Sequence, residues 1–200
     1  MSWTKAPLFN LPNQLTSLRL LLAVVMFDFI HWECYLTSMG LFLVAAGTDW
    51  LDGYFARKYG QVTTLGRILD PFADKVIICG AFIFLAAIPA LTDLSGSLRP
   101  WMVVVIVGRE LLVTALRSFI EDRGADFSAQ MSGKLKMVFQ CVAAAAGMFT
   151  LSYGDDPRGP LVVPGWVHFT LVASVWLAVV STVYSGVVYV FAAVRLLKAA

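Results

Sequence analysis

Long runs of apolar residues, separated by short polar segments, occupy most of the chain. A membrane-spanning helix needs about 20 mostly apolar residues, and six runs meet or approach that length. They cover approximately residues 15–32, 35 to beyond 47, 70–88, 101–120, 136–153 and 166–197. We therefore predict an all-α fold: a polytopic membrane protein with six transmembrane helices in one domain that covers residues 1–200.

Prolines mark several ends of these runs. Pro89 ends the third run and Pro100 opens the fourth, because proline lacks an amide donor and fits best in the first turn of a helix. The same rule predicts that Pro71 places Asp70 near the start of the third helix. Residues 1–13 read as a short interfacial lead-in to the first span, and we expect no removable signal peptide.

Composition and charge support a membrane protein and indicate its orientation. Hydrophobic residues make up 59% of the chain, charged residues 14%, and the mean hydropathy is +0.77. Of the 15 Lys and Arg residues, 13 fall on the inner side when the amino terminus is placed inside. Short basic loops stay in the cytoplasm, so we expect both termini to be cytoplasmic. No basic cluster with interleaved aromatic residues exists, and we expect no nucleic-acid partner.

Four aspartates stand at the polar ends of the second and third spans: Asp49, Asp52, Asp70 and Asp74. Within each pair the spacing of three or four residues places both carboxylates on one helix face. Clustered carboxylates repel one another without a cation among them, and such hard oxygen ligands suit Mg²⁺ or Mn²⁺. The alternatives are solvated acids that cap helices and acids that line an ion pathway. Gly53 and Ala56 leave the same face nearly bare, and Arg57 suits phosphate, which ion passage does not require.

The spacing D-x2-D-G-x2-A-R-x8-G-x3-D-x3-D resembles the signature of the CDP-alcohol phosphotransferase family, whose members synthesise phospholipids. Every fixed position of that signature is matched here, by Asp49, Asp52, Gly53, Ala56, Arg57, Gly66, Asp70 and Asp74. The match covers 26 residues at fixed spacings, and the layout of six spans extends the similarity over most of the chain.

The resemblance implies a polar cavity open to the cytoplasm, a two-metal site with Mg²⁺ or Mn²⁺, and a homodimer in membrane lipid. The metal ligands would be Asp49, Asp52, Asp70 and Asp74. Asp74 would also act as the catalytic general base. The CDP group would be bound by Asp52, Gly53, Ala56, Arg57, Gly66 and Asp70, with Arg57 on the pyrophosphate.

Three basic residues bear on the acceptor alcohol: Arg109, Arg117 and Lys134. Arg109 lies inside an apolar run, where an unpaired cation is costly, and Arg117 follows about two turns later. An acceptor phosphate would justify this group. Alternatively, Arg109 pairs with Glu110 or an aspartate, and the other two residues serve orientation only. Glu110 is adjacent to Arg109 and should point elsewhere, so Arg19 is its candidate partner.

Segments 10–19, 108–117 and 133–136 resemble the bacterial phosphatidylglycerophosphate synthase branch of the family. The resemblance implies transfer of the phosphatidyl group of CDP-diacylglycerol to sn-glycerol 3-phosphate, with release of CMP, at the bacterial inner membrane. Phosphatidylinositol-phosphate synthases are the nearest alternative, because an inositol phosphate acceptor also demands basic groups. An ion-binding membrane transporter is the alternative from another class.

Overall fold

The computed structural model describes residues 11–59, 64–121, 131–154 and 161–199. Within these ranges the chain forms seven helices and no strand. The helices are α1 (Leu11–His31), α2 (Tyr35–Tyr59), α3 (Thr64–Ala86), α4 (Pro89–Thr92), α5 (Pro100–Glu121), α6 (Met131–Leu151) and α7 (Gly165–Ala199). The chain divides into two compact units, residues 1–84 and residues 85–200.

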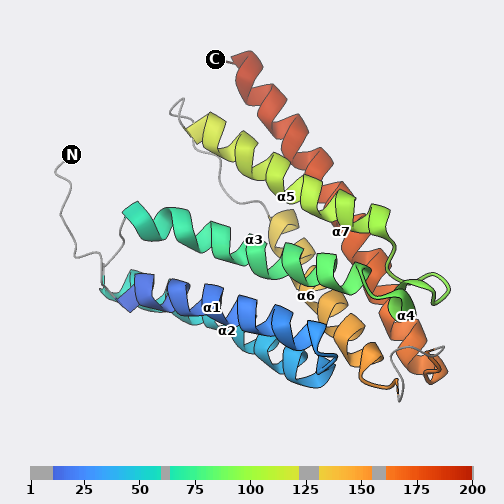
Figure 1. Cartoon of the computed structure of the whole chain (residues 1–200). Helices are drawn as coiled ribbons and strands as arrows, with labels where there is room; N and C mark the ends of the chain where they lie inside the picture. Colours follow the sequence, from blue (N-terminus) through green and yellow to red (C-terminus); the bar gives the residue numbers. More distant parts are fainter. Residues whose placement is uncertain (1–10, 60–63, 122–130, 155–160, 200) are drawn as a thin grey trace. The chain divides into compact units, whose positions relative to one another are not determined.

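The six long helices coincide with the six predicted spans, which confirms the all-helical class (Figure 1). Among the described helices, α7 alone is long and apolar enough over residues Gly165–Leu196 to cross a membrane. Shorter apolar stretches occupy Tyr35–Thr48 of α2 and Leu135–Leu151 of α6. Residues 11–13 of the predicted lead-in belong to α1, and residues 1–10 lie outside the described ranges.

The third helix begins earlier than the sequence predicts. α3 starts at Thr64, so Pro71 lies inside the helix and not in its first turn. The prediction was wrong because it considered only the cost of an internal proline, about 3 kcal/mol. It left out the helical turns that form before the proline. The residues before Pro71 extend the helix by almost two turns, and the proline side chain is exposed, away from the packed face. Asp70 and Asp74 therefore stand well inside α3.

A proline does end the apolar run at the other end of this helix. α3 stops at Ala86, and Pro89 opens the separate short helix α4. Ile88 between them is extended, with φ −94° and ψ 109°, because the residue before a proline avoids the helical region.

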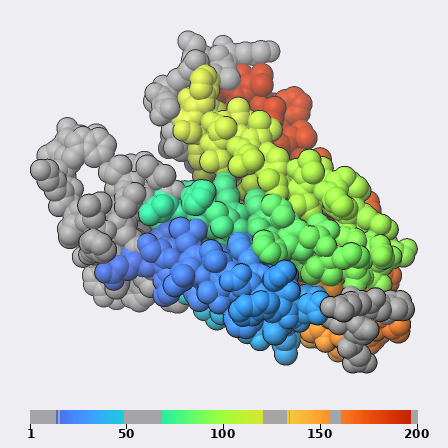
Figure 2. All heavy atoms as spheres, viewed as in Figure 1, coloured from blue at the N-terminus to red at the C-terminus, as the bar shows by residue number. Residues whose placement is uncertain are grey.

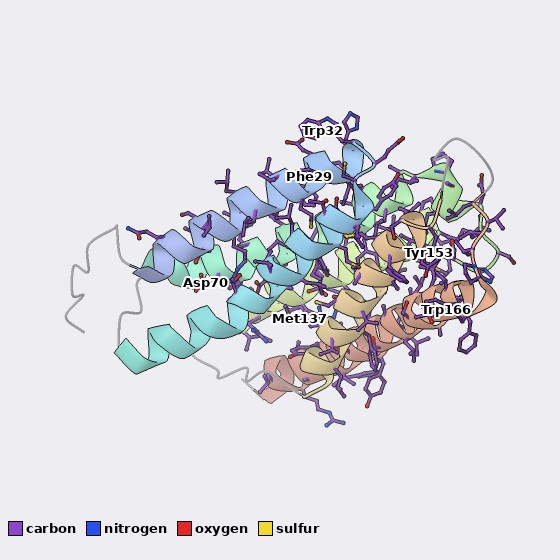
Figure 3. All side chains as sticks on the ribbon, turned by 90° about the horizontal axis from the view of Figure 1, so that it is seen from below. Phe29, Trp32, Asp70, Met137, Tyr153 and Trp166 are labelled. Carbon is purple, nitrogen blue, oxygen red and sulfur yellow. The ribbon has the colours of Figure 1, made fainter. Side chains whose placement is uncertain are left out.

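In the first unit, α1 and α2 form an antiparallel pair, side by side along their described lengths (Figures 1 and 3). The turn between them includes Glu33, whose φ is +63°. α3 packs on α1 at the apolar end, where the rings of Phe27 and Phe84 stack with centroids 4.8 Å apart. Leu18 and Leu21 of α1 are exposed, as expected for a helix in contact with lipid. Figure 2 shows α1 at the surface of the first unit.

The α1–α3 packing depends on a glycine. A Cβ atom added at Gly80 would overlap the ring of Phe27, which is held in its stack with Phe84. We expect Gly80→Ala to destabilise the protein by about 1–3 kcal/mol, because the ring must leave its place. Gly40→Ala on α2 is the matched control: no atom lies within 4 Å of an added Cβ there, and stability should hold or rise slightly. Thermal unfolding in detergent measures both, and equal stability of the two variants would contradict the packing argument.

In the second unit, α7 packs along both α5 and α6, and α4 contacts α6 (Figure 1). One end of this unit is aromatic. The rings of Phe149, Tyr153 and Trp166 lie with centroids 5.3–6.3 Å apart, and Figure 3 shows Tyr153 and Trp166 near that end. Such amphipathic rings are typical of a membrane–water interface.

The loop before α5 is tied to α7 near this aromatic end. His168 is hydrogen bonded through Nε2 to the Ser95 carbonyl at 2.8 Å, and Trp176 donates from Nε1 to the Gly96 carbonyl at 3.1 Å. Gly96 has φ +73°, a conformation that glycine adopts without steric cost. These contacts give His168 a structural explanation.

Candidate functional site

The aspartate string is carried by α2 and α3. Residues 49, 52, 53, 56 and 57 fall in α2, and residues 66, 70 and 74 in α3. The side chains of Asp49, Asp52, Gly53, Ala56, Arg57 and Gly66 lie outside the described part. The helical backbone gives positions 49, 52, 53 and 56 the register of one helix face, as predicted. Of the four aspartates of the string, Asp70 and Asp74 are the two whose side chains are described.

Asp70 and Asp74 lie one turn apart on α3, and each contacts a residue of α1. Thr16 donates a hydrogen bond from Oγ1 to Oδ1 of Asp70. Arg19 donates from Nη1 to Oδ1 of Asp74 over 3.0 Å, which also forms an ion pair. Arg19 is 1% exposed and Asp74 28% exposed. In Figure 3, Asp70 lies toward one end of the first unit, and Phe29 and Trp32 lie toward the other.

The buried face of α1 explains these contacts. Its buried residues follow one another at steps of three and four: Thr16, Arg19, Ala23, Met26 and Ile30. Such steps form one stripe along a helix. The stripe is polar over its first turn and apolar beyond it. α3 shows the same change, with Asp70 and Asp74 followed by buried Ile77 and Ala81. The polar end of α1 therefore contacts the polar end of α3, and the apolar end of α1 contacts the apolar end of α3.

The position of Glu110 differs in part from the prediction. Glu110 contacts Lys136 and Arg109, and Arg19 contacts Asp74. The expectation that Glu110 points away from Arg109 was therefore wrong, whereas its pairing with Arg19 stays a prediction. That expectation assumed that neighbours such as Arg109 and Glu110 diverge by about 100° around a helix. That holds for the Cβ atoms, but the long arginine stem brings its guanidinium back to the adjacent carboxylate.

The donor atoms of the site suit a divalent cation. Carboxylate oxygens are the ligands that Mg²⁺ and Mn²⁺ prefer, and Asp70 and Asp74 present them from one helix face. Among the described side chains no three His, Cys, Asp or Glu residues lie close enough together to hold a metal ion. The side chains of Asp49 and Asp52 are not part of that set. The residues that the structure describes fit part of such a site.

A second cluster of charged residues joins the three long helices of the second unit. Glu110 of α5 accepts from Lys136 of α6 and, at 3.4 Å, from Arg109. Gln140 of α6 donates to Thr182 of α7 at 2.9 Å. Arg109, Glu110, Lys136, Gln140 and Thr182 are all buried. The three ionisable groups of this buried cluster carry two positive charges and one negative charge.

Arg109 has further partners on α7. Its Nη2 donates to Ser185 Oγ at 2.5 Å, and its guanidinium lies 5.3 Å from the ring centroid of Tyr189, within the range of a cation–π contact. A Cβ added at Gly186 would lie 3.2 Å from Cγ of Arg109, so the glycine makes room for the arginine stem. The alternative that Arg109 pairs with Glu110 is thus part of the structure.

The structure says less about Arg117 and Lys134, the other two candidates for binding the acceptor phosphate. Arg117 on α5 is half-buried, and its Nε atom is buried without a hydrogen-bond partner among the described residues. The side chain of Lys134 lies outside the described part. Lys136, two positions further along α6, is the lysine that joins Arg109 through Glu110. From the sequence we identified the segment 133–136 but proposed Lys134 as the site residue. We predicted no role in the site for Lys136.

Sequence reasoning also gave no site role to Thr16 and Arg19, the two α1 residues that contact the aspartates. A signal was available. Arg19 interrupts an apolar run, where a cation needs a partner, and Thr16 precedes it by one helical step of three on the same face. Which acids these residues meet could not be read from the chain, because the contacts join residues 54 and 55 positions apart.

Comparison with known proteins agrees with the aspartate signature. Residues 9–184 match the family described as CDP-alcohol phosphatidyltransferase. A protein of Bacillus subtilis (strain 168), named CDP-diacylglycerol–glycerol-3-phosphate 3-phosphatidyltransferase, is 38% identical over 154 residues, which cover 70% of this chain and 76% of the relative. A probable phosphatidylglycerophosphate synthase of Mycobacterium tuberculosis (strain CDC 1551 / Oshkosh) is 36% identical over 197 residues, with 96% and 85% covered.

A third relative extends the similarity over nearly its whole length. The protein of Escherichia coli (strain K12) named CDP-diacylglycerol–glycerol-3-phosphate 3-phosphatidyltransferase is 30% identical over 195 residues, which cover 92% of this chain and 95% of the relative. The similarity to these relatives thus extends well beyond the aspartate string.

Proposed function

Because the chain belongs to the CDP-alcohol phosphatidyltransferase family, we propose that it transfers the phosphatidyl group of CDP-diacylglycerol to sn-glycerol 3-phosphate. The products are phosphatidylglycerol phosphate and CMP, and the reaction belongs to phospholipid synthesis. The observation that carries this proposal is the complete aspartate string, whose last two carboxylates lie one turn apart on α3 against polar partners of α1. The names of the relatives support the choice of both substrates.

The proposed setting is a bacterial inner membrane, which the chain crosses six times with both termini in the cytoplasm. Support comes from the six long helices, from apolar side chains exposed on both units, and from the distribution of Lys and Arg. Large apolar side chains are exposed on each of the six long helices, whereas soluble proteins rarely expose large apolar patches. We include a homodimer in the proposal, with the remaining exposed apolar surface covered by lipid.

The proposed cofactor is a pair of Mg²⁺ or Mn²⁺ ions held by Asp49, Asp52, Asp70 and Asp74. When bound, such ions would stabilise the negative charge that develops on phosphoryl oxygens during in-line displacement. The chain itself would supply the carboxylates, and α1 would hold two of them through Thr16 and Arg19.

The residues divide the remaining tasks. Asp52, Gly53, Ala56, Arg57, Gly66 and Asp70 would bind the CDP group. The permanently charged fork of Arg57 would hold the pyrophosphate, and the glycines would let the nucleotide lie close to the backbone. The two acyl chains of the donor would stay in the lipid, outside the polar site.

Asp74 would take the proton of the acceptor hydroxyl. The freed oxygen would attack the phosphorus atom that carries diacylglycerol, forming the new phosphodiester bond. The bond from that phosphorus to the bridging oxygen would break, and CMP would leave with the electron pair. The proton stays on Asp74 until it passes to solvent.

The acceptor phosphate would need cations, and Arg109, Arg117 and Lys134 are the proposed ones. The buried cluster around Glu110 holds more positive than negative side chains, and the Nε atoms of Arg109 and Arg117 lack a hydrogen-bond partner among the described residues. An anion in this region would be stabilised by both features. A neutral acceptor would gain nothing from them.

An acceptor screen tests the proposed function. Purified protein in lipid nanodiscs with CDP-diacylglycerol is expected to release CMP with sn-glycerol 3-phosphate and Mg²⁺ or Mn²⁺. CMP release should fall to background with glycerol alone, and also after chelation of the metal. Faster CMP release with inositol phosphate would replace the acceptor but keep the chemistry. Metal flux into liposomes without any CMP release would instead favour the transporter.

A further inference from the structure

We propose that Thr16 and Arg19 are positioning residues of the aspartate site, through which α1 sets the orientation of Asp70 and Asp74. This inference rests on the proposed function and names residues outside the aspartate string. Thr16 donates to Oδ1 of Asp70, and Arg19 donates to Oδ1 of Asp74 at 3.0 Å. Each aspartate described in the site therefore receives a hydrogen bond from α1.

The two hydrogen bonds orient the carboxylates of Asp70 and Asp74 more than they strengthen the packing of α1 against α3. Thr16 and Arg19 are 0% and 1% exposed, and burial of a polar or charged group costs free energy unless it is hydrogen bonded. Ala23 and Met26 on the same stripe show that apolar side chains can fill this face of α1. Apolar residues at positions 16 and 19 would pack the helices but would give the carboxylates no fixed orientation.

The chemistry of the two donors differs in a useful way. The Thr16 hydroxyl is neutral, so it fixes Asp70 without adding a charge that repels a metal ion. The Arg19 guanidinium is planar and permanently charged, and its Nη1 holds Asp74 at a defined distance. Partners behind metal-binding carboxylates orient them, and their loss typically lowers metal affinity or activity about 10–100-fold. We expect an effect of that size here.

The first test measures metal binding without turnover. Mn²⁺ is titrated into purified protein, with no lipid substrate, and free Mn²⁺ is followed by electron paramagnetic resonance. Thr16→Val removes the donor at nearly constant volume and is expected to weaken Mn²⁺ binding about 10–100-fold. Thr16→Ser keeps the hydroxyl and should bind within a few-fold of the unchanged protein.

Ser38→Ala is the control for a merely structural loss. Ser38 is buried in the same unit and donates a hydrogen bond to the Cys34 carbonyl at 2.9 Å. It lies on α2 about three helical turns before Asp49. Its loss should lower thermal stability and leave Mn²⁺ affinity unchanged. Equal Mn²⁺ affinity of Thr16→Val and the unchanged protein would overturn the inference, as would an equal loss of affinity in Ser38→Ala.

The second test uses turnover to examine Arg19. Arg19→Met should lower kcat for CMP release at least 10-fold, with KM for glycerol 3-phosphate changed only a few-fold, because Asp74 loses its orientation and not its substrate. Arg19→Lys retains a donor and should recover part of kcat. No recovery by lysine, or a change confined to KM, would count against a positioning role.

The two proposals fail in distinguishable ways. Absence of CMP release from the unchanged protein would overturn the proposed function, whereas the Mn²⁺ titration of the Thr16 variants needs no turnover. Wild-type turnover with normal Mn²⁺ affinity in Thr16→Val would overturn the inference and leave the function standing.

Discussion

Replacement of Asp74 by asparagine is expected to lower CMP release about 10²–10⁴-fold, the usual contribution of a positioned general base. Asparagine keeps the shape of the side chain and can still meet Arg19, which lies 3.0 Å from the carboxylate. It cannot accept the proton of the acceptor hydroxyl. The rate of CMP release at saturating CDP-diacylglycerol and sn-glycerol 3-phosphate measures the loss.

Asp28→Asn is the matched control for Asp74→Asn. Asp28 is an exposed carboxylate of α1 in the same unit, and its replacement changes the net charge by the same amount. We expect its rate to equal that of the unchanged protein. Asp74→Asn must also elute and unfold like the unchanged protein. If that folded variant kept more than about a tenth of the rate, the assignment of Asp74 as base would be wrong.

The second large effect concerns stability. Glu110→Gln is expected to destabilise the protein by about 3–5 kcal/mol, because Arg109 and Lys136 lose the carboxylate that they share in a buried cluster. Lys136→Met should cost much less. It removes one of the two cations and leaves Arg109 paired with Glu110 at 3.4 Å. Loss of Glu110 is thus expected to lower stability more than loss of Lys136, although the two residues form one ion pair.

A double-mutant cycle makes this asymmetry quantitative. The free energies of unfolding of Glu110→Gln, Lys136→Met and the double variant can be obtained from reversible unfolding in mixed micelles. Since Glu110 and Lys136 are in contact, the double variant should be more stable than the sum of the single losses predicts. Additive losses, or a Lys136→Met variant as unstable as Glu110→Gln, would contradict the shared-carboxylate argument.

Local rules explain the parts of the fold that could be predicted. The six apolar runs became the six long helices, because an apolar segment that lies in lipid can satisfy its backbone donors and acceptors only within its own helix or in a closed barrel. The extension of α2 to Tyr59 gives positions 49, 52, 53 and 56 the predicted helical register. Spacing and residue type also identify the family signature, since both are properties of the chain itself.

Rules about single residues predicted the structure less well. Pro71 was predicted to lie in a first turn, whereas α3 begins at Thr64. One proline removes one hydrogen bond, and its position in a helix depends on how well the preceding turn packs and bonds. Likewise, the adjacency of Arg109 and Glu110 was taken to separate them, but side-chain length overrides the direction of the Cβ atoms.

By itself, therefore, the sequence determined the helices, the aspartate string and the family, because each depends on residues close together in the chain. Only the tertiary structure decided the partners of the charged groups. Thr16 meets Asp70 and Arg19 meets Asp74 across more than 50 positions, and Lys136 reaches Glu110 from another helix. A buried charge requires a partner, but many acids can satisfy that requirement. Which one does so depends on which helix faces pack together.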